Sequence, residues 1–258
     1  MCAVRQTGMR YAGGINMDIR LDEGYWFGLG VFETIAVENG RAVLLEEHLK
    51  RLKKGMSFFS LKNVVSRQLI LNYLHKNPME HGALKIAVSQ ENIILEHRQN
   101  LYQEEDYKRG FRVRFSQVMR NESSPFTYFK TFNYGDSILE KRTALSSGYD
   151  ECIFCNSRGE ICEGATSNIF FVKGGKIYSP KLECGLLQGV IRDYIYQNEK
   201  VTDTVILKNE VDKFDECFVT NSLMGIMPVV EFEGHKFLSK DIGYLLMHKY
   251  RLYINNYI

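Results

Sequence analysis

The sequence contains few of the features that mark specialised classes of protein. Its apolar runs, such as residues 169–172, are as long as a strand and far shorter than the roughly 20 residues that a membrane-spanning helix needs. With 33 basic and 31 acidic residues, the net charge of +2 argues against nucleic acid or a membrane surface as a partner. Arg5 and Arg10 precede no apolar signal-peptide core, so we expect a cytoplasmic protein.

A metal site is also not indicated. Cys152 and Cys155 form a C-x-x-C motif, but no second pair of cysteines has ligand spacing. Residues 151–156 are typical of a strand, in which positions three apart point to opposite faces. We therefore interpret both cysteines as buried structural residues. The six histidines show no metal-ligand spacing either, and His48 is expected on the surface of a helix.

The pattern of predicted elements favours an α+β fold. Hydrophobic residues make up 45% of the 258 residues and charged residues 25%, as in ordinary globular proteins. Predicted strands and helices occur in clusters, without the regular alternation of a parallel α/β sheet. The polar run that ends at Pro125 is the best linker candidate. We therefore predict a small N-terminal α+β domain (residues 1–118), a linker (119–126) and a larger C-terminal domain (127–258).

Four segments in the second half of the chain carry the chemical signal. They are Lys130–Tyr134 (KTFNY), Asp150–Cys152 (DEC), Glu163–Phe170 (EGATSNIF) and Gly185–Arg192 (GLLQGVIR). In this order and at these spacings they resemble the class IV aminotransferase family. Its members are pyridoxal 5′-phosphate (PLP) enzymes of fold type IV, with a small N-terminal and a larger C-terminal α+β domain. The resemblance extends from Gly24 to about Gly234 and implies the same fold and cofactor here.

The resemblance assigns three residues to the ring of the cofactor. Lys130 would be the lysine that holds the aldehyde as a Schiff base and then moves protons. It follows the aromatic segment Phe126–Phe129, and apolar surroundings would lower its pKa as this chemistry requires. Tyr134 would bind the ring hydroxyl. Glu163 would face the ring nitrogen and keep it protonated, so that the ring accepts electrons.

A phosphate site is expected from three parts of the chain. Val190 and Ile191 open a predicted helix, whose free N–H groups suit phosphate. Family transaminases commonly have threonine where this chain has Ile191, so only the backbone donor remains there. By resemblance, Arg51 and Ser222 supply the other two contacts.

The substrate side is expected near the segment Phe27–Thr34. It contains G-x-G, but no dinucleotide fingerprint follows. It resembles the N-terminal segment of the family that lines the substrate side, with Leu29 in place of aspartate. Phe32 and Thr34 are therefore expected to face substrate, with Thr34 or Lys130 as the acid for a leaving group. Arg98 is a candidate carboxylate ligand, with an exposed surface charge as the alternative.

Within the family, the segment Thr220–Val229 is most similar to aminodeoxychorismate lyases. An Arg-x-His motif, typical of D-amino-acid transaminases, is absent from residues 83–102. The resemblance thus predicts a PLP-dependent lyase that converts 4-amino-4-deoxychorismate to 4-aminobenzoate and pyruvate for folate synthesis. The alternatives are a transaminase of D-amino acids or branched-chain L-amino acids, and a binding protein of the same fold without catalysis. The resemblance also implies a small-molecule amine substrate and a homodimer.

Overall fold

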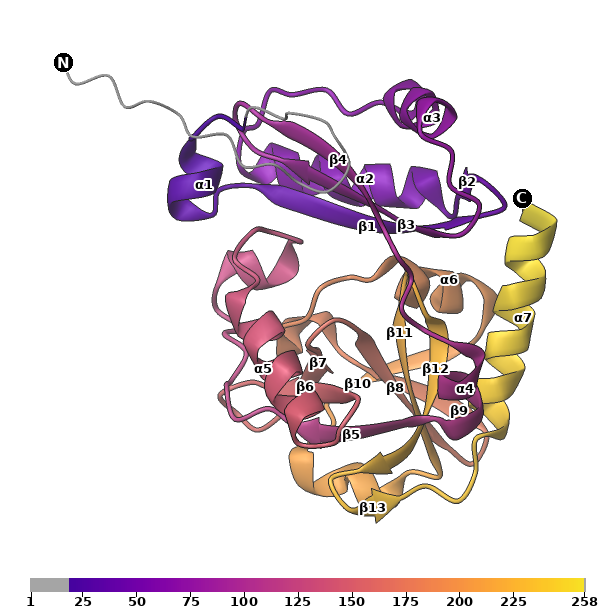
Figure 1. The fold of residues 1–258 in the computed structure, drawn as a ribbon. Coiled ribbons are helices and arrows are strands. Elements are labelled where there is room, and N and C mark those ends of the chain that lie inside the picture. Colours follow the sequence, from indigo (N-terminus) through magenta and orange to yellow (C-terminus); the bar gives the residue numbers. More distant parts are fainter. Residues whose placement is uncertain (1–18, 258) are drawn as a thin grey trace.

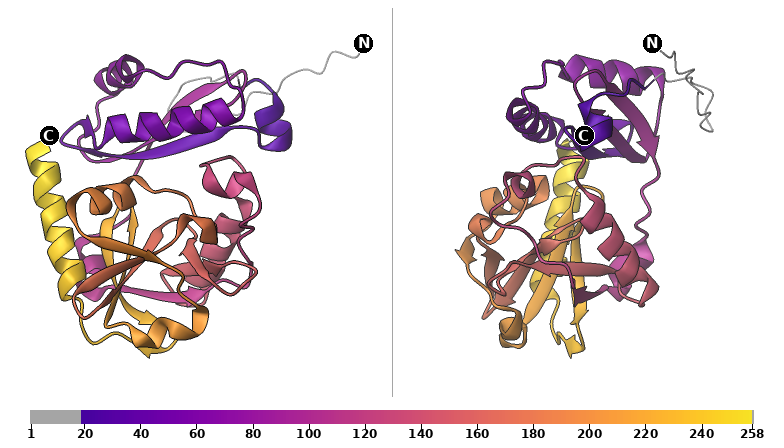
Figure 2. Two further views of the ribbon diagram at one scale, coloured as in Figure 1. Left: turned by 180° about the vertical axis from the view of Figure 1, so that it is seen from behind. Right: turned by 90° about the vertical axis from the view of Figure 1, so that its left-hand side faces the viewer.

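The computed structural model describes residues 19–257 and consists of two α+β units, each built on its own sheet (Figure 1). The α+β class predicted from the sequence is therefore confirmed. Views from behind and from the side show the smaller unit lying across one end of the larger one (Figure 2).

The smaller unit is a four-stranded antiparallel sheet in the order β2-β1-β3-β4. Helices α2 and α3 cover the face of this sheet that is turned away from the larger unit (Figure 1). Alternate residues of β1, such as Val31 and Ile35, pack under α2, whereas Phe32 and Thr34 point to the other face. The elements are α1 (Glu23–Phe27), β1 (Val31–Glu38), β2 (Arg41–Ala42), α2 (Leu45–Phe58), α3 (Arg67–Lys76), β3 (Gly82–Val88) and β4 (Ile93–Arg98).

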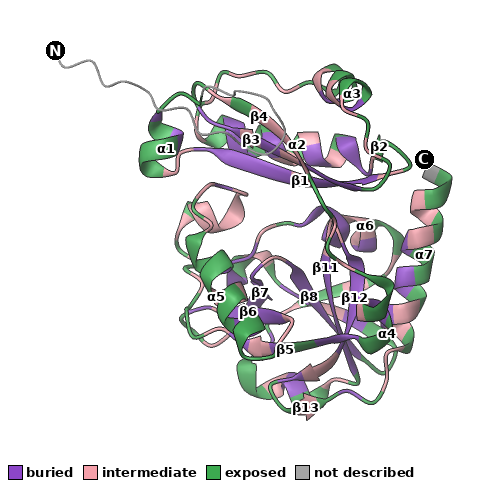
Figure 3. Ribbon diagram, viewed as in Figure 1, coloured by how far each residue is buried: buried purple, intermediate pink, exposed green. Residues whose placement is uncertain are grey.

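The larger unit is a nine-stranded mixed sheet in the order β10-β9-β8-β11-β12-β5-β6-β7, with β13 paired to β12. Its central strands are almost wholly buried, as Figure 3 shows. The strands are β5 (Phe111–Phe115), β6 (Glu151–Cys155), β7 (Ile161–Gly164), β8 (Asn168–Lys173), β9 (Lys176–Pro180), β10 (Val201–Thr204), β11 (Glu216–Asn221), β12 (Gly225–Phe232) and β13 (His235–Lys236). The α-helices are α4 (Glu104–Arg109), α5 (Gly135–Ser146), α6 (Val190–Asn198) and α7 (Asp241–Tyr257).

The crossing between the two units does not coincide with the linker expected at residues 119–126. The chain leaves β4 and enters α4 through residues 99–103, and β5 pairs in parallel with both β12 and β6. Residues 119–126 lie inside the larger unit. The backbone of Arg120 forms an isolated β-bridge with Asn156, and a 3-10 turn begins at Pro125. Residues 111–115 alternate apolar and basic side chains as a strand does, but the partners of this strand lie far along the chain, and periodicity does not reveal them.

The two cysteines of the C-x-x-C motif lie in the sheet of the larger unit. Cys152 is fully buried in β6, and Cys155 on the same strand is partly buried. Within residues 19–257, no three metal-binding side chains gather at one place, and no helix has the length and apolar character to cross a membrane. Arg5 and Arg10 lie outside the described residues.

Candidate active site

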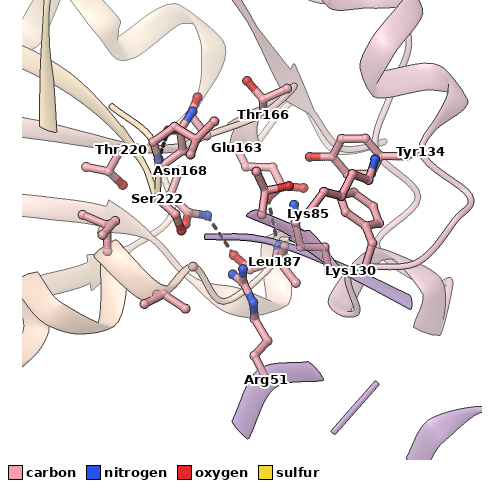
Figure 4. A pocket seen from close by; sticks show the side chains of 18 of the residues that line it. Arg51, Lys85, Lys130, Tyr134, Glu163, Thr166, Asn168, Leu187, Thr220 and Ser222 are labelled. Carbon is pink, nitrogen blue, oxygen red and sulfur yellow. Dashed lines mark hydrogen bonds between the residues drawn. The ribbon is translucent and has the colours of Figure 1, made fainter. Parts of the chain in front are cut away.

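A cavity of about 570 Å³ lies between the two units and contains side chains from both. Figure 4 shows part of its lining, with Lys130, Glu163, Tyr134 and Arg51 around the same space. All ten residues singled out in the sequence line this cavity. They are Phe32, Thr34, Arg51, Arg98, Lys130, Tyr134, Glu163, Val190, Ile191 and Ser222.

Lys130 lies at the junction of the units. Its carbonyl accepts a hydrogen bond from Phe32 N at 2.9 Å, which ties it to β1. Its Nζ lies 4.4 Å from the ring centroid of Phe32 and 4.9 Å from that of Tyr134. Burial, reinforced by the positive charge of Arg51, lowers the pKa of Lys130 to about 8. An appreciable share of neutral amine is therefore present at mildly alkaline pH, as a nucleophile or base requires.

Glu163, at the end of β7, is a buried carboxylate with two fixed partners. Arg120 Nη2 lies 3.0 Å from Glu163 Oε1, and Leu187 N donates to Oε2 at 2.9 Å. Burial raises the pKa of Glu163, while the charge of Arg120 opposes that rise. Arg120 also stacks on Phe154, with its guanidinium carbon 4.0 Å from the ring centroid. Sequence reasoning missed Arg120 because it belongs to the polar run interpreted as a linker.

Tyr134 presents a neutral phenol to the cavity. Its hydroxyl donates to the Ala165 carbonyl at 2.9 Å, and its ring makes an edge contact with Phe32 at 5.2 Å. Burial, with the nearby charge of Glu163, raises the pKa of Tyr134 well above its usual value. The group therefore stays protonated. Its one hydrogen is donated to Ala165, so its oxygen remains available to accept a hydrogen bond from the cavity.

The opposite end of the cavity has the features of an anion site. Gly189 is the N-cap of α6 and makes no side-chain cap, so the N–H groups of Val190 and Ile191 are available to an anion. A Cβ at Gly189 would lie 1.9 Å from Asn168 Oδ1, so the chain requires glycine there. The buried Thr220 hydroxyl lines the same region and has no hydrogen-bond partner among the described residues. An orphaned donor beside a free helix start suits phosphate.

Arg51 extends to this end from α2. Its Nε and Nη2 each lie 2.7 Å from an oxygen of Glu33, and its Nη1 donates to the Gln188 carbonyl at 3.2 Å. The expectation that His48 lies on the helix surface is wrong. His48 is buried, and its Nδ1 lies 2.7 Å from Glu33 Oε2. The signal in the sequence was Glu33 itself. A glutamate within an apolar strand needs polar partners, and α2 supplies them.

The wall of the cavity that is expected to face substrate, called here the substrate wall, is formed by three neighbouring strands of the smaller unit. Thr34 on β1 is opposite Lys85 on β3, and Lys85 is opposite Glu96 on β4. Lys85 Nζ lies 4.6 Å from the ring centroid of Phe32, and burial lowers its pKa. Arg98 lines the rim of the cavity, is about half exposed and pairs with Glu96 at 2.7 Å. The exposure of Arg98 agrees with the surface-charge alternative, and its role as a ligand of a substrate carboxylate stays a prediction. Lys85 is a lining cation that the sequence did not single out.

Comparison with known proteins assigns the class. Residues 30–232 match the sequence profile of the family Amino-transferase class IV. The chain therefore belongs to this family of PLP-dependent enzymes, as its motifs predicted. The residues present fit that cofactor: an amine with a lowered pKa, a buried carboxylate, a phenol, and an arginine beside a free helix start.

Particular relatives include both lyases and transaminases. The chain is 27% identical to aminodeoxychorismate lyase of Bacillus subtilis over 238 residues, covering 82% of this chain and 80% of the relative. It is 29% identical over 247 residues to a probable branched-chain-amino-acid aminotransferase of Thermotoga maritima, covering 91% and 88%. A solved putative 4-amino-4-deoxychorismate lyase of Legionella pneumophila has the same fold, with a TM-score of 0.82, 22% identity, and coverage of 93% and 96%.

Proposed function

We propose that this protein is a PLP-dependent 4-amino-4-deoxychorismate lyase that yields 4-aminobenzoate and pyruvate. The substrate divides into its two products with nothing added, so no keto acid takes part. The cofactor, when bound, supplies an electron sink for the carbon that bears the substrate amine.

The roles of the residues follow from their places. Lys130 Nζ, with its lowered pKa, holds the cofactor and then takes the proton from the ring carbon of the substrate. Glu163, fixed by Arg120 and Leu187 N, would face the cofactor ring nitrogen and keep it protonated. The proton that Lys130 has taken from the ring carbon then passes to the departing enolpyruvyl group, either from Lys130 itself or through the Thr34 hydroxyl.

At the other end of the cofactor, four residues form the proposed phosphate site. Arg51, the N–H groups of Val190 and Ile191, and Ser222 would hold the phosphate, and Tyr134 would hold the ring hydroxyl. Because these contacts come from both units, cofactor binding would join the two sheets.

The basic character of the substrate wall is the observation that carries the choice of lyase. Aminodeoxychorismate has two carboxylates, one on its ring and one on its enolpyruvyl group. Lys85 and Arg98 line the same wall as Phe32 and Thr34, and Lys85 has no carboxylate ion-pair partner among the described residues. Cations at two points suit a dicarboxylate better than the aliphatic side chain of a branched-chain amino acid. The similarity to the Bacillus subtilis lyase over most of both chains supports the same choice.

The second candidate is a transaminase, favoured by the 29% identity to the Thermotoga maritima relative. In that reaction Lys130 would move a proton from the substrate Cα back to the cofactor, and a keto acid would then remove the amine. The two candidates therefore differ in their need for a second substrate.

The test is to mix the purified protein, loaded with PLP, with enzymatically generated aminodeoxychorismate and no keto acid. The lyase gives the fluorescence of 4-aminobenzoate at catalytic rates, and Lys130→Ala abolishes it. No product from protein that shows bound-cofactor absorbance would reject the lyase. L- and D-amino acids with 2-oxoglutarate or pyruvate would then test the transaminase.

We also infer a homodimer, as the family resemblance implies. Tyr25, Trp26 and Phe27 on α1 expose 60–67% of their surface, which suits burial against a second copy. Sedimentation at micromolar concentration tests this inference, and a monomer would contradict it.

A further inference from the structure

A buried cluster of charged groups lies beneath the proposed phosphate site. Glu33 is fully buried on β1, on the face opposite Phe32 and Thr34, where α2 covers the sheet. Both of its oxygens are used. Arg51 Nε lies 2.7 Å from Oε1, and Arg51 Nη2 and His48 Nδ1 each lie 2.7 Å from Oε2. Burying a carboxylate is costly, so a strand otherwise rich in apolar residues would not be expected to contain one for stability alone.

We propose that Glu33, supported by His48, is a positioning residue that holds the Arg51 guanidinium in the orientation needed to bind the cofactor phosphate. The inference rests on the proposed role of Arg51 and adds the two residues that act through it. Two parallel bonds from one carboxylate fix both the position and the plane of a guanidinium, which a single bond cannot do.

The remaining edge of Arg51 is directed by the same arrangement. Its Nη1 donates to the Gln188 carbonyl at 3.2 Å, and Gln188 immediately precedes Gly189, the N-cap of α6. The guanidinium from the smaller unit is therefore held beside the free N–H groups of the larger one. An anion at the start of α6 would meet donors from both units.

His48 completes the cluster as a neutral donor. It lies three residues before Arg51 on α2, so both side chains reach Glu33 from one face of the helix. Burial lowers the pKa of His48 even though Glu33 opposes that effect, which favours a neutral ring. The ionised Glu33 carboxylate can only accept, so the hydrogen between them belongs to His48 Nδ1. With Arg51 positive and Glu33 negative, the cluster has no net charge. Its attraction for phosphate therefore depends on the direction of the guanidinium rather than on an excess of charge.

The isosteric change Glu33→Gln separates orientation from charge. Glutamine keeps one acceptor oxygen and turns an amide NH₂ toward the guanidinium, so one of the two bonds is lost. Charge alone predicts the reverse result, because removing a carboxylate near phosphate would strengthen its binding. Orientation predicts weaker binding of the phosphate and no change for a ligand that lacks it.

The experiment compares PLP with pyridoxal, which has no phosphate, on cofactor-free protein. Dissociation constants are measured by absorbance for the wild type and for Glu33→Gln. We expect the preference for PLP over pyridoxal to fall at least 10-fold in the variant, with pyridoxal affinity nearly unchanged. Arg51→Met should lower the preference too, and adding Glu33→Gln to Arg51→Met should lower it no further, because Glu33 acts through Arg51.

Two controls keep the test decisive. Glu216→Gln removes another buried carboxylate, which accepts from the N–H of Ile242 outside the cavity, and should lower stability without changing the preference. If Glu33→Gln does not fold, His48→Gln leaves the Glu33–Arg51 pair in place and should lower the preference by a smaller factor. An unchanged or increased preference for PLP in the variant that folds would overturn the inference. The measurement needs no substrate, so it is independent of the lyase assignment, and a wild type that does not prefer PLP would instead reject the role of Arg51.

Discussion

Replacing Lys130 by methionine should abolish catalysis and yet stabilise the cofactor-free protein near neutral pH. Burial and the charge of Arg51 lower the pKa of Lys130 from 10.5 to about 8, which corresponds to roughly 3 kcal/mol of destabilisation of its charged form. Lys130 is only partly buried and faces a cavity, where water screens its charge. We therefore expect about 1–3 kcal/mol of added stability at pH 7.

The dependence on pH distinguishes this charge effect from better packing. At pH 7 the amine is charged in both the folded and the unfolded chain, so its full cost is present. Between pH 8 and 10.5 the unfolded chain binds more protons at Lys130 than the folded one, so wild-type stability rises with pH. Above 10.5 the amine is neutral in both states. The advantage of methionine should therefore shrink across this window to a constant packing difference.

Urea unfolding of both cofactor-free proteins at pH 7, 8, 9 and 10 measures the effect. The other titrating groups are the same in both proteins, so their contributions cancel in the difference between the two free energies of unfolding. Lys54→Met, on an exposed position of α2, controls for loss of a surface lysine. A difference between wild type and Lys130→Met that stays constant from pH 7 to 10 would refute the reasoning. So would a variant less stable than wild type at pH 7.

Three further predictions concern the other charged groups. Glu163→Gln should retain the cofactor but slow turnover about 100-fold or more, measured by absorbance and rate, and an unchanged rate would remove Glu163 from its role. Arg120→Met leaves Glu163 buried without its partner and should lower the free energy of unfolding by about 3 kcal/mol in denaturant titrations. Arg120→Lys should recover part of that loss, and equal losses would show that only packing matters. Lys85→Met should raise KM for aminodeoxychorismate about 10-fold with kcat nearly unchanged, and an effect on kcat alone would argue against substrate binding.

The sequence located the residues of the site better than their partners. Lys130 and Glu163 stand out because the short motifs around them resemble those of the family, and such motifs can be recognised without knowledge of tertiary contacts. Their neighbours depend on tertiary contacts. Arg120 reaches Glu163 across 43 residues, and Arg51 reaches the Gln188 carbonyl across 137. Nothing in the local pattern of either arginine indicates these contacts.

The sequence also did not predict where the smaller unit ends or which strand residues line the cavity, for a related reason. Alternation shows that Lys85 shares a face with Ala87, but the face that meets the cavity is decided by which side α2 covers. Likewise, β5 has the pattern of a strand in either sheet. Its parallel pairing with β6 and β12 assigns it to the larger unit, and the residues of β12 come more than 100 positions later.

Two arginines and two lysines of the cavity differ in how they are held. The buried carboxylate of Glu33 holds Arg51 in place before any ligand arrives, whereas the half-exposed Arg98 pairs with Glu96 at the rim. Lys130 and Lys85 form no ion pair with a carboxylate among residues 19–257, and both ammonium groups lie within 5 Å of the Phe32 ring centroid. A cation held only by an aromatic face gives up little when it meets a new partner. We therefore expect these two amines to exchange partners in the proposed reaction, Lys130 with the cofactor and Lys85 with a substrate carboxylate, while Arg51 fixes the place of the cofactor phosphate.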